Sequence, residues 1–206
     1  MRGLEQSEAK PILGTEGGSG PFFSPDGHWV GFFADNQIKK VPVDGGPPVV
    51  ICEVPRARFG LFGASWAEDG TILFSDRGAG ISKVASGGGS PITVTSSDIA
   101  KGERHLLPQS LPGGKAIIFT VLPSFYEWDK AQIVLQSLET GERRVLILGG
   151  VDARYIQTGH LLYMKIGTLI AVPFDPRTLQ VVGNPTALIE NVMQAINAPD
   201  TQDETG

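Results

Sequence analysis

The sequence is poor in cysteine. Cys52 is the only one in 206 residues, so no disulfide can form within the chain. It stands at the end of the apolar run Val49–Cys52, and we therefore expect a small buried side chain rather than a reactive thiol. A lone cysteine is compatible with a reducing compartment but does not require one.

Basic charge and long hydrophobic runs are also scarce. The net charge is −5 and no long basic run occurs, which makes nucleic acid and anionic membrane poor partners. No apolar run approaches the ~20 residues of a membrane helix. The first ten residues, MRGLEQSEAK, lack the apolar core of a signal peptide. The chain as written is expected to be soluble, without a membrane span.

Familiar catalytic motifs are absent as well. The sequence has no H-R-D or D-F-G kinase motif and no G-x-S-x-G hydrolase motif. The glycine-rich stretch at 14–20 resembles a phosphate loop only superficially, because Pro21 and a hairpin pattern follow it. These absences predict a chain that is not an enzyme, with no catalytic residues and no cofactor.

The acidic residues and histidines do not show the spacing of a metal site. Asp98, Glu103 and His105 are close in sequence but match neither zinc-site nor EF-hand spacing. No metal is therefore predicted. The interpretation we favour for His105 is a hydrogen bond that braces the connection between two repeats.

Glycine and proline, in contrast, are abundant. The 27 glycines and 15 prolines are more than a helical protein would carry, and they indicate turns between many short strands. Hydrophobic residues make up 41% and charged residues 19%, which favours a packed core over disorder. Helical content should be negligible.

One turn recurs along the chain. In PFFSPDGHWVGFF, Pro25 and Asp26 suit the corners of a tight turn, and Gly27 suits a left-handed residue that closes a hairpin. The same kind of turn is expected at three later sites: Asp69-Gly70, Gly113-Gly114 and Gly159. The anchor glycines 27, 70, 114 and 159 are spaced by 43, 44 and 45 residues.

A second hairpin follows each of these turns, so each repeat holds four strands. A period of ~40–45 residues with four strands per repeat is typical of a β-propeller blade. The strand Trp29–Phe33 hardly alternates polar with apolar residues, as expected if both faces of its sheet are covered by neighbouring blades. The sequence therefore predicts an all-β fold of about four blades, each with four antiparallel strands.

The predicted blades have approximate bounds. We expect a connector and the closing strand of a preceding blade at 1–17, and a linker toward a next blade at 195–206. Between them, the expected blades are 18–58, 59–100, 101–149 and 150–194.

The turn and its neighbours also carry a family resemblance. Ser24-Pro25-Asp26-Gly27 before an aromatic strand resembles the motif of WD-repeat-like, TolB-type β-propellers. Longer stretches, including SWAEDGTILF, LPGGKAIIFT and TGHLLYMKIGTLIAVPFD, are similar to the propeller region of acidobacterial-type, eukaryotic-like serine/threonine kinases. The resemblance covers roughly 5–198. It implies part of a six- or seven-bladed ring, on the extracytoplasmic side of a membrane-anchored bacterial kinase.

This resemblance makes the expected function that of a non-catalytic sensor or protein-interaction module in signal transduction. The partner would be a protein, a peptide or a small extracytoplasmic ligand. Two alternatives are a TolB-like periplasmic scaffold that binds envelope proteins and the gating propeller of a serine peptidase. A complete four-bladed ring, or two chains that associate through their end blades, are alternatives to a partial ring.

Two loops are the candidate contact surfaces. The loop at 54–63 joins the first two blades. The loop at 121–132 lengthens the third blade, because 52 residues separate Ile81 from Ile133 against 43 between Ile38 and Ile81. Aromatic and charged side chains on such loops suit a protein contact, although the aromatics of the second loop could equally fold back onto their own blade. The candidate residues are Arg56, Arg58, Phe59, Phe125, Tyr126, Glu127, Trp128 and Asp129.

Overall fold

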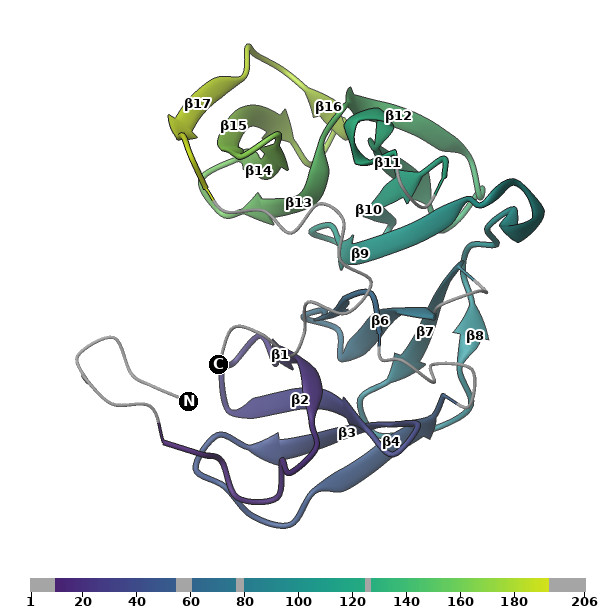
Figure 1. Cartoon of the computed structure of the whole chain (residues 1–206), viewed down its shortest axis with the longest axis vertical. Helices are drawn as coiled ribbons and strands as arrows, with labels where there is room; N and C mark the ends of the chain where they lie inside the picture. The colour runs from purple at the N-terminus through teal and green to yellow at the C-terminus, as the bar shows by residue number, and fades with distance from the viewer. Residues whose placement is uncertain (1–9, 55–60, 77–79, 125–126, 193–206) are drawn as a thin grey trace.

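The structure, a computed structural model, describes residues 10–54, 61–76, 80–124 and 127–192. Four antiparallel sheets follow one another along the chain, and we call them blades 1 to 4 (Figure 1). Blade 1 holds β1 Ser19–Phe23, β2 Trp29–Ala34, β3 Gln37–Pro42 and β4 Val49–Glu53; blade 2 holds β5 Ala64–Trp66, β6 Thr71–Asp76, β7 Gly80–Ala85 and β8 Ile92–Thr93. Blade 3 holds β9 Arg104–Ser110, β10 Ala116–Leu122, β11 Gln132–Ser137 and β12 Arg143–Leu148; blade 4 holds β13 Val151–Ile156, β14 His160–Lys165, β15 Thr168–Asp175, β16 Gln180–Val181 and β17 Thr186–Ile189.

Every blade is a meander in which each strand pairs with the next strand of the chain. In blade 4 the fourth position is divided between β16, which pairs with one end of β15, and β17, which pairs with the other end. The predicted all-β fold with four-stranded antiparallel blades is therefore confirmed. The only helices in the described ranges are two short 3₁₀ turns, η1 Ile99–Lys101 and η2 Trp128–Lys130.

The inner strands of the blades are buried on both faces. Along β6, Ile72 and Phe74 pack toward blade 1, whereas Leu73 packs toward blade 3. All three side chains are at most 1% exposed. Successive residues of a strand point to opposite faces, so a strand between two neighbouring sheets needs apolar residues at every position. This explains the absence of alternation in the sequence.

The blades form an arc in which each blade packs against the next one (Figure 1). One apolar cluster joins blades 1 and 2, a second joins blades 2 and 3, and a third joins blades 3 and 4. The first strands β1, β5, β9 and β13 contact one another in sequence along the inner side of the arc. This arrangement of sheets around a centre is that of propeller blades.

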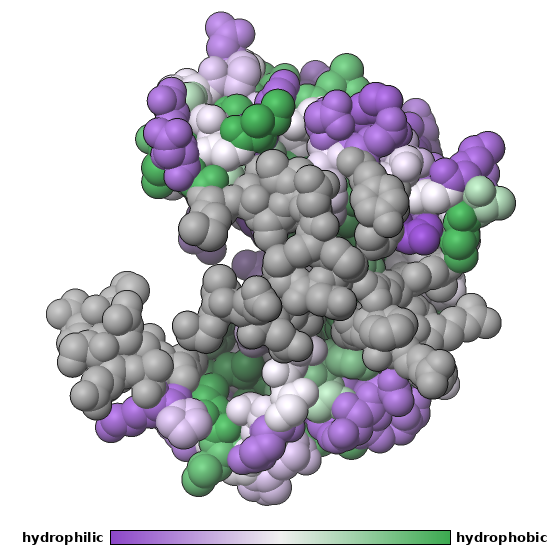
Figure 2. Space-filling model, viewed as in Figure 1, coloured by the Kyte–Doolittle hydropathy of each residue, from purple (hydrophilic) through white to green (hydrophobic). Residues whose placement is uncertain are grey.

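The outward face of blade 1 is covered by the segment at 10–18. Ile12 packs against the buried side chains Val30, Phe32 and Val41. The segment approaches closely, because a Cβ built on Gly18 would lie 2.9 Å from the Phe32 ring. At the other end of the arc β17 is exposed along its whole length, and Figure 2 shows hydrophobic surface at both ends.

Candidate functional site

The first hairpin turns of all four blades share one geometry. The anchor glycines Gly27, Gly70, Gly114 and Gly159 have φ between +66° and +81°, in the left-handed region. Each donates its backbone N–H to the carbonyl three residues earlier, at 2.9 to 3.0 Å. Since the first strands lie side by side along the inner side of the arc, the turns that follow them gather around its centre.

In blade 1 the turn is also held by its own side chains. The Ser24 hydroxyl lies 2.5 Å from Asp26 Oδ1 and accepts the Trp29 backbone N–H at 2.9 Å. Asp26 Oδ1 also accepts the His28 N–H at 3.0 Å. The Ser24 bond, followed by the His28 backbone bond, holds the pKa of the Asp26 carboxyl below its usual value. In blade 2, Asp69 Oδ1 accepts the Thr71 N–H at 2.8 Å in the same way.

A cavity of about 450 Å³ lies where the four turns meet, and we call it the axial cavity. Its volume is within the range of about 300–1,000 Å³ that ligand pockets occupy. Blade 1 contributes Pro25 to the described lining, and blade 4 contributes Tyr155 and Gln157. The rest of that lining comes from blades 2 and 3: Ser65, Trp66, Ala67, Glu68, Asp69, Gln109, Ser110, Leu111, Pro112, Gly113 and Gly114.

Two half-buried aromatic side chains line this cavity and are held by packing. Trp66 lies against Phe22, with ring centroids 6.3 Å apart, and the Lys40 ammonium lies 5.8 Å from the Trp66 ring. Tyr155 packs edge-on against Phe174 at 6.1 Å. Such side chains present flat, rigid surfaces for a ligand at little cost in conformational entropy.

The polar groups of the cavity fall into two sets. Gln109 is occupied, because its amide oxygen accepts the Tyr155 N–H at 2.6 Å and its amide nitrogen approaches the Tyr155 carbonyl at 3.4 Å. The Ser65 hydroxyl oxygen, in contrast, is buried and is the only such side-chain atom without a hydrogen-bond partner in the described residues. A buried hydroxyl without a partner costs about 1–3 kcal/mol. An ordered water that bonds Ser65 would remove that cost.

Of the predicted contact residues, the structure describes Glu127, Trp128 and Asp129, and none of these three lines the axial cavity. Arg56, Arg58, Phe59, Phe125 and Tyr126 lie outside the described residues. Glu127 stands at the N-cap position of η2 without a side-chain capping hydrogen bond and pairs with Lys130, and Asp129 lies within η2.

Trp128 packs against a cluster that contains Leu106, Leu122 and Val151. Its ring therefore contributes to the core. This agrees with the alternative that the aromatic side chains of the loop at 121–132 fold back onto the protein. The other loop residues stay predicted contacts.

His105 forms the brace that the sequence favours. It is 2% exposed, and its Nδ1 lies 2.7 Å from the Thr95 hydroxyl of the preceding blade, while its Nε2 lies 2.9 Å from Glu103 Oε1. The Ile81 N–H donates to Thr95 Oγ1 at 2.9 Å, so the hydroxyl proton is available for Nδ1. Thr95 is itself 2% exposed. The nucleophile–histidine–carboxylate order is present, but the hydroxyl is closed off from a substrate.

Cys52 is buried, as predicted. It is 5% exposed, and desolvation raises the pKa of its thiol to about 11. The thiolate is the reactive form of cysteine, so the structure confirms Cys52 as a packing residue. In the described ranges no three His, Cys, Asp or Glu side chains are grouped to hold a metal ion. Nor does any helix there have the length and hydrophobicity to cross a membrane.

Comparison with known proteins identifies the fold. No protein-family model matches the sequence, and no curated protein matches it. Solved structures do match. Regucalcin from Agrobacterium tumefaciens, described as a calcium-binding protein, has a TM-score of 0.61 at 18% identity over 89% of this chain and 61% of its own. TolB from Acinetobacter baumannii gives 0.57 at 19% identity over 79% and 41%. Oligogalacturonate lyase from Vibrio parahaemolyticus gives 0.58 at 13% identity over 97% and 62%.

These matches correct one prediction. We expected a chain that is not an enzyme because kinase and hydrolase motifs are missing. An oligogalacturonate lyase has the same fold, so the absence of those motifs does not place a propeller outside the enzymes. The absence of motifs of two enzyme classes was too narrow a basis for excluding catalysis, because one fold can host unrelated functions.

The chain spans between two fifths and two thirds of the length of these solved structures. The resemblance to kinase propellers finds no counterpart among them. Sheet topology, the arc of blades and the structural matches together show that the chain has a β-propeller fold.

Proposed function

We propose that this chain is the ligand-binding part of a larger propeller protein and that it binds a peptide or protein segment in the axial cavity. The observation that carries the proposal is a cavity of about 450 Å³ to which all four blades contribute, lined by the half-buried rings of Trp66 and Tyr155. Few convergent polar groups among aromatic surfaces are typical of ligand sites. Propellers of this shape include binding proteins, since regucalcin is described as a calcium-binding protein.

The identity of the whole protein is a separate proposal. The sequence motifs support a sensor for a serine/threonine kinase on the extracytoplasmic side of a membrane, and the TolB match supports an envelope scaffold. A peptidase gate is the third candidate. The DNA on both sides of this reading frame discriminates among them. A kinase domain would support the sensor, a signal peptide without a kinase would support the envelope scaffold, and an α/β-hydrolase domain would support the peptidase gate.

Affinity selection from a library of capped random peptides tests the binding proposal. We expect the immobilised chain to enrich peptides that lose binding in Gln157→Trp, because Gln157 is exposed on the cavity rim and a large ring there would fill the opening. Thr158→Trp is the matched control, since Thr158 is the exposed neighbour outside the described lining. Peptides that bind Gln157→Trp as well as the natural chain, or a library without enrichment, would exclude the axial cavity as a peptide site.

A further inference from the structure

We propose that the axial cavity selects a cationic group, the ammonium or guanidinium of a lysine or arginine side chain on a bound peptide. This inference rests on the proposed function and adds the chemical class of the ligand. It comes from the charges of the lining, the orientation of its carboxylates and its aromatic surfaces.

The described lining carries negative charge only. Glu68 and Asp69 are its charged residues, and neither lysine, arginine nor histidine belongs to that lining. An anionic ligand such as a phosphate or a uronic acid would approach two carboxylates. Lys40, whose ammonium lies 5.8 Å from the Trp66 ring, already donates to the Ser86 carbonyl at 2.8 Å. Like charges at short range repel, so the lining disfavours anionic ligands and favours cationic ones.

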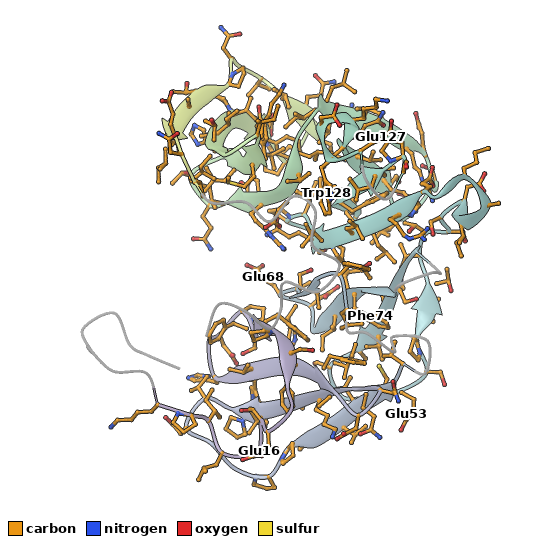
Figure 3. All side chains as sticks on the ribbon, in the orientation of Figure 1. Glu16, Glu53, Glu68, Phe74, Glu127 and Trp128 are labelled. Atoms are coloured by element: carbon orange, nitrogen blue, oxygen red, sulfur yellow. The ribbon has the colours of Figure 1, made fainter. Side chains whose placement is uncertain are left out.

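Both carboxylates have oxygen atoms available. Asp69 uses Oδ1 for the Thr71 N–H, whereas Oδ2 faces the turn of blade 3, where a Cβ built on Gly114 would lie 3.5 Å away. Glu68 is exposed, and Figure 3 shows it near the centre of the arc. Two carboxylates on one side of a cavity can both bond a guanidinium, which has five N–H donors in a planar fork.

The remaining lining suits the rest of a basic residue. The turn at Gly113 and Gly114 has open space beside Gly113, because a Cβ built on Gly113 would have no heavy atom within 4 Å. An extended side chain can therefore lie beside this turn at Gly113, whereas the blade 2 turn already contacts it at Gly114. The methylene stem of lysine or arginine would lie against Trp66 and Tyr155. Because Lys40 already lies over the Trp66 ring, the cation would gain from the Tyr155 ring.

The test uses isotope-labelled chain and capped tripeptides. Acetyl-Gly-Arg-Gly-amide and its lysine analogue should shift backbone amide signals of residues 65–69, 109–114 and 155–157, and the glutamate and glutamine analogues should not. Glu68→Gln should weaken binding of the arginine peptide by about three- to tenfold. Glu139→Gln is the matched control, because Glu139 is an exposed carboxylate on the β11–β12 turn, outside the described lining. It should leave binding unchanged.

The outcomes separate this inference from the proposed function. Equal shifts from the glutamine peptide would keep a peptide site but overturn the cationic class. Spermidine that binds as tightly as the arginine peptide would overturn a peptide source for the cation. Arginine binding that shifts signals elsewhere, or no binding by any probe, would overturn both proposals. Affinity that falls between about 0.05 and about 0.5 M NaCl would support a charge-dependent contact, and affinity independent of salt would contradict it.

Discussion

At the scale of single residues, His105 connects blades 2 and 3 while it remains neutral. Its ring accepts from Thr95, donates to Glu103 and packs against Phe119 at a tilt of 56°, with centroids 5.1 Å apart. Burial lowers the pKa of His105 below 6.5, and the Arg143 guanidinium adds to this shift while Glu103 opposes it. Protonation would remove the acceptor at Nδ1 and place a charge inside the interface. The brace therefore depends on pH.

The pKa shift gives the first prediction. Because the pKa of His105 is lower in the folded chain than in the unfolded chain, the unfolded chain binds more protons as the pH falls below about 6.5. The free energy of unfolding should therefore decrease between about pH 7 and about pH 5, measured by urea denaturation. A His105→Gln variant should be less stable at neutral pH but should lose this pH dependence. If the free energy of unfolding of the variant falls with pH as steeply as that of the natural chain, groups other than His105 cause the effect.

At the scale of elements, the repeated hairpin turn depends on the backbone conformation of one glycine. Gly27 has φ +71°, and a Cβ built on it would meet no heavy atom within 4 Å. Replacement therefore adds strain without a steric clash. Gly27→Val should lower the free energy of unfolding by roughly 1–3 kcal/mol.

A matched glycine controls for the loss of backbone freedom. Gly87 also has open space around a built Cβ, but its φ lies outside the left-handed region. Gly87→Val should thus cost much less in a urea titration than Gly27→Val. Gly27→Asn should recover part of the loss, because asparagine tolerates the left-handed region better than valine does. Equal costs for the two valine variants would show that strain at Gly27 does not decide the stability of the turn.

The turns also show why the fold could be predicted from the sequence while the site could not. The anchor glycines and the apolar strands after them are local signals that repeat. The axial cavity is non-local, because Ser65, Gln109 and Tyr155 meet only when three blades are turned about one centre. A signal did exist: Trp66, Ser110 and Tyr155 each stand four residues before an anchor glycine. The outer strands gave weaker signals, since β8 is two residues long and the fourth strand of blade 4 is split.

At the scale of the whole molecule, the arc makes each blade depend on its neighbours in the chain. In repeat proteins stability is approximately a sum of the repeats and their shared interfaces. An end blade of an arc has one interface, whereas a blade within a closed ring has two. Phe74, marked in Figure 3, is 1% exposed in the interface of blades 1 and 2, and Phe174 is 2% exposed in that of blades 3 and 4.

These two phenylalanines make the arrangement testable by hydrogen exchange. Each replacement by alanine should cost about 3–5 kcal/mol, as expected for a buried ring. If the described chain behaves as an arc, Phe74→Ala should accelerate exchange in peptides from blade 1 (residues 19–53) while blade 4 (residues 151–189) keeps its protection. Phe174→Ala should give the reverse pattern, so each variant is the control for the other. Loss of protection in all four blades with either variant would instead indicate one cooperative unit, because local opening of an end blade would then cost as much as global unfolding.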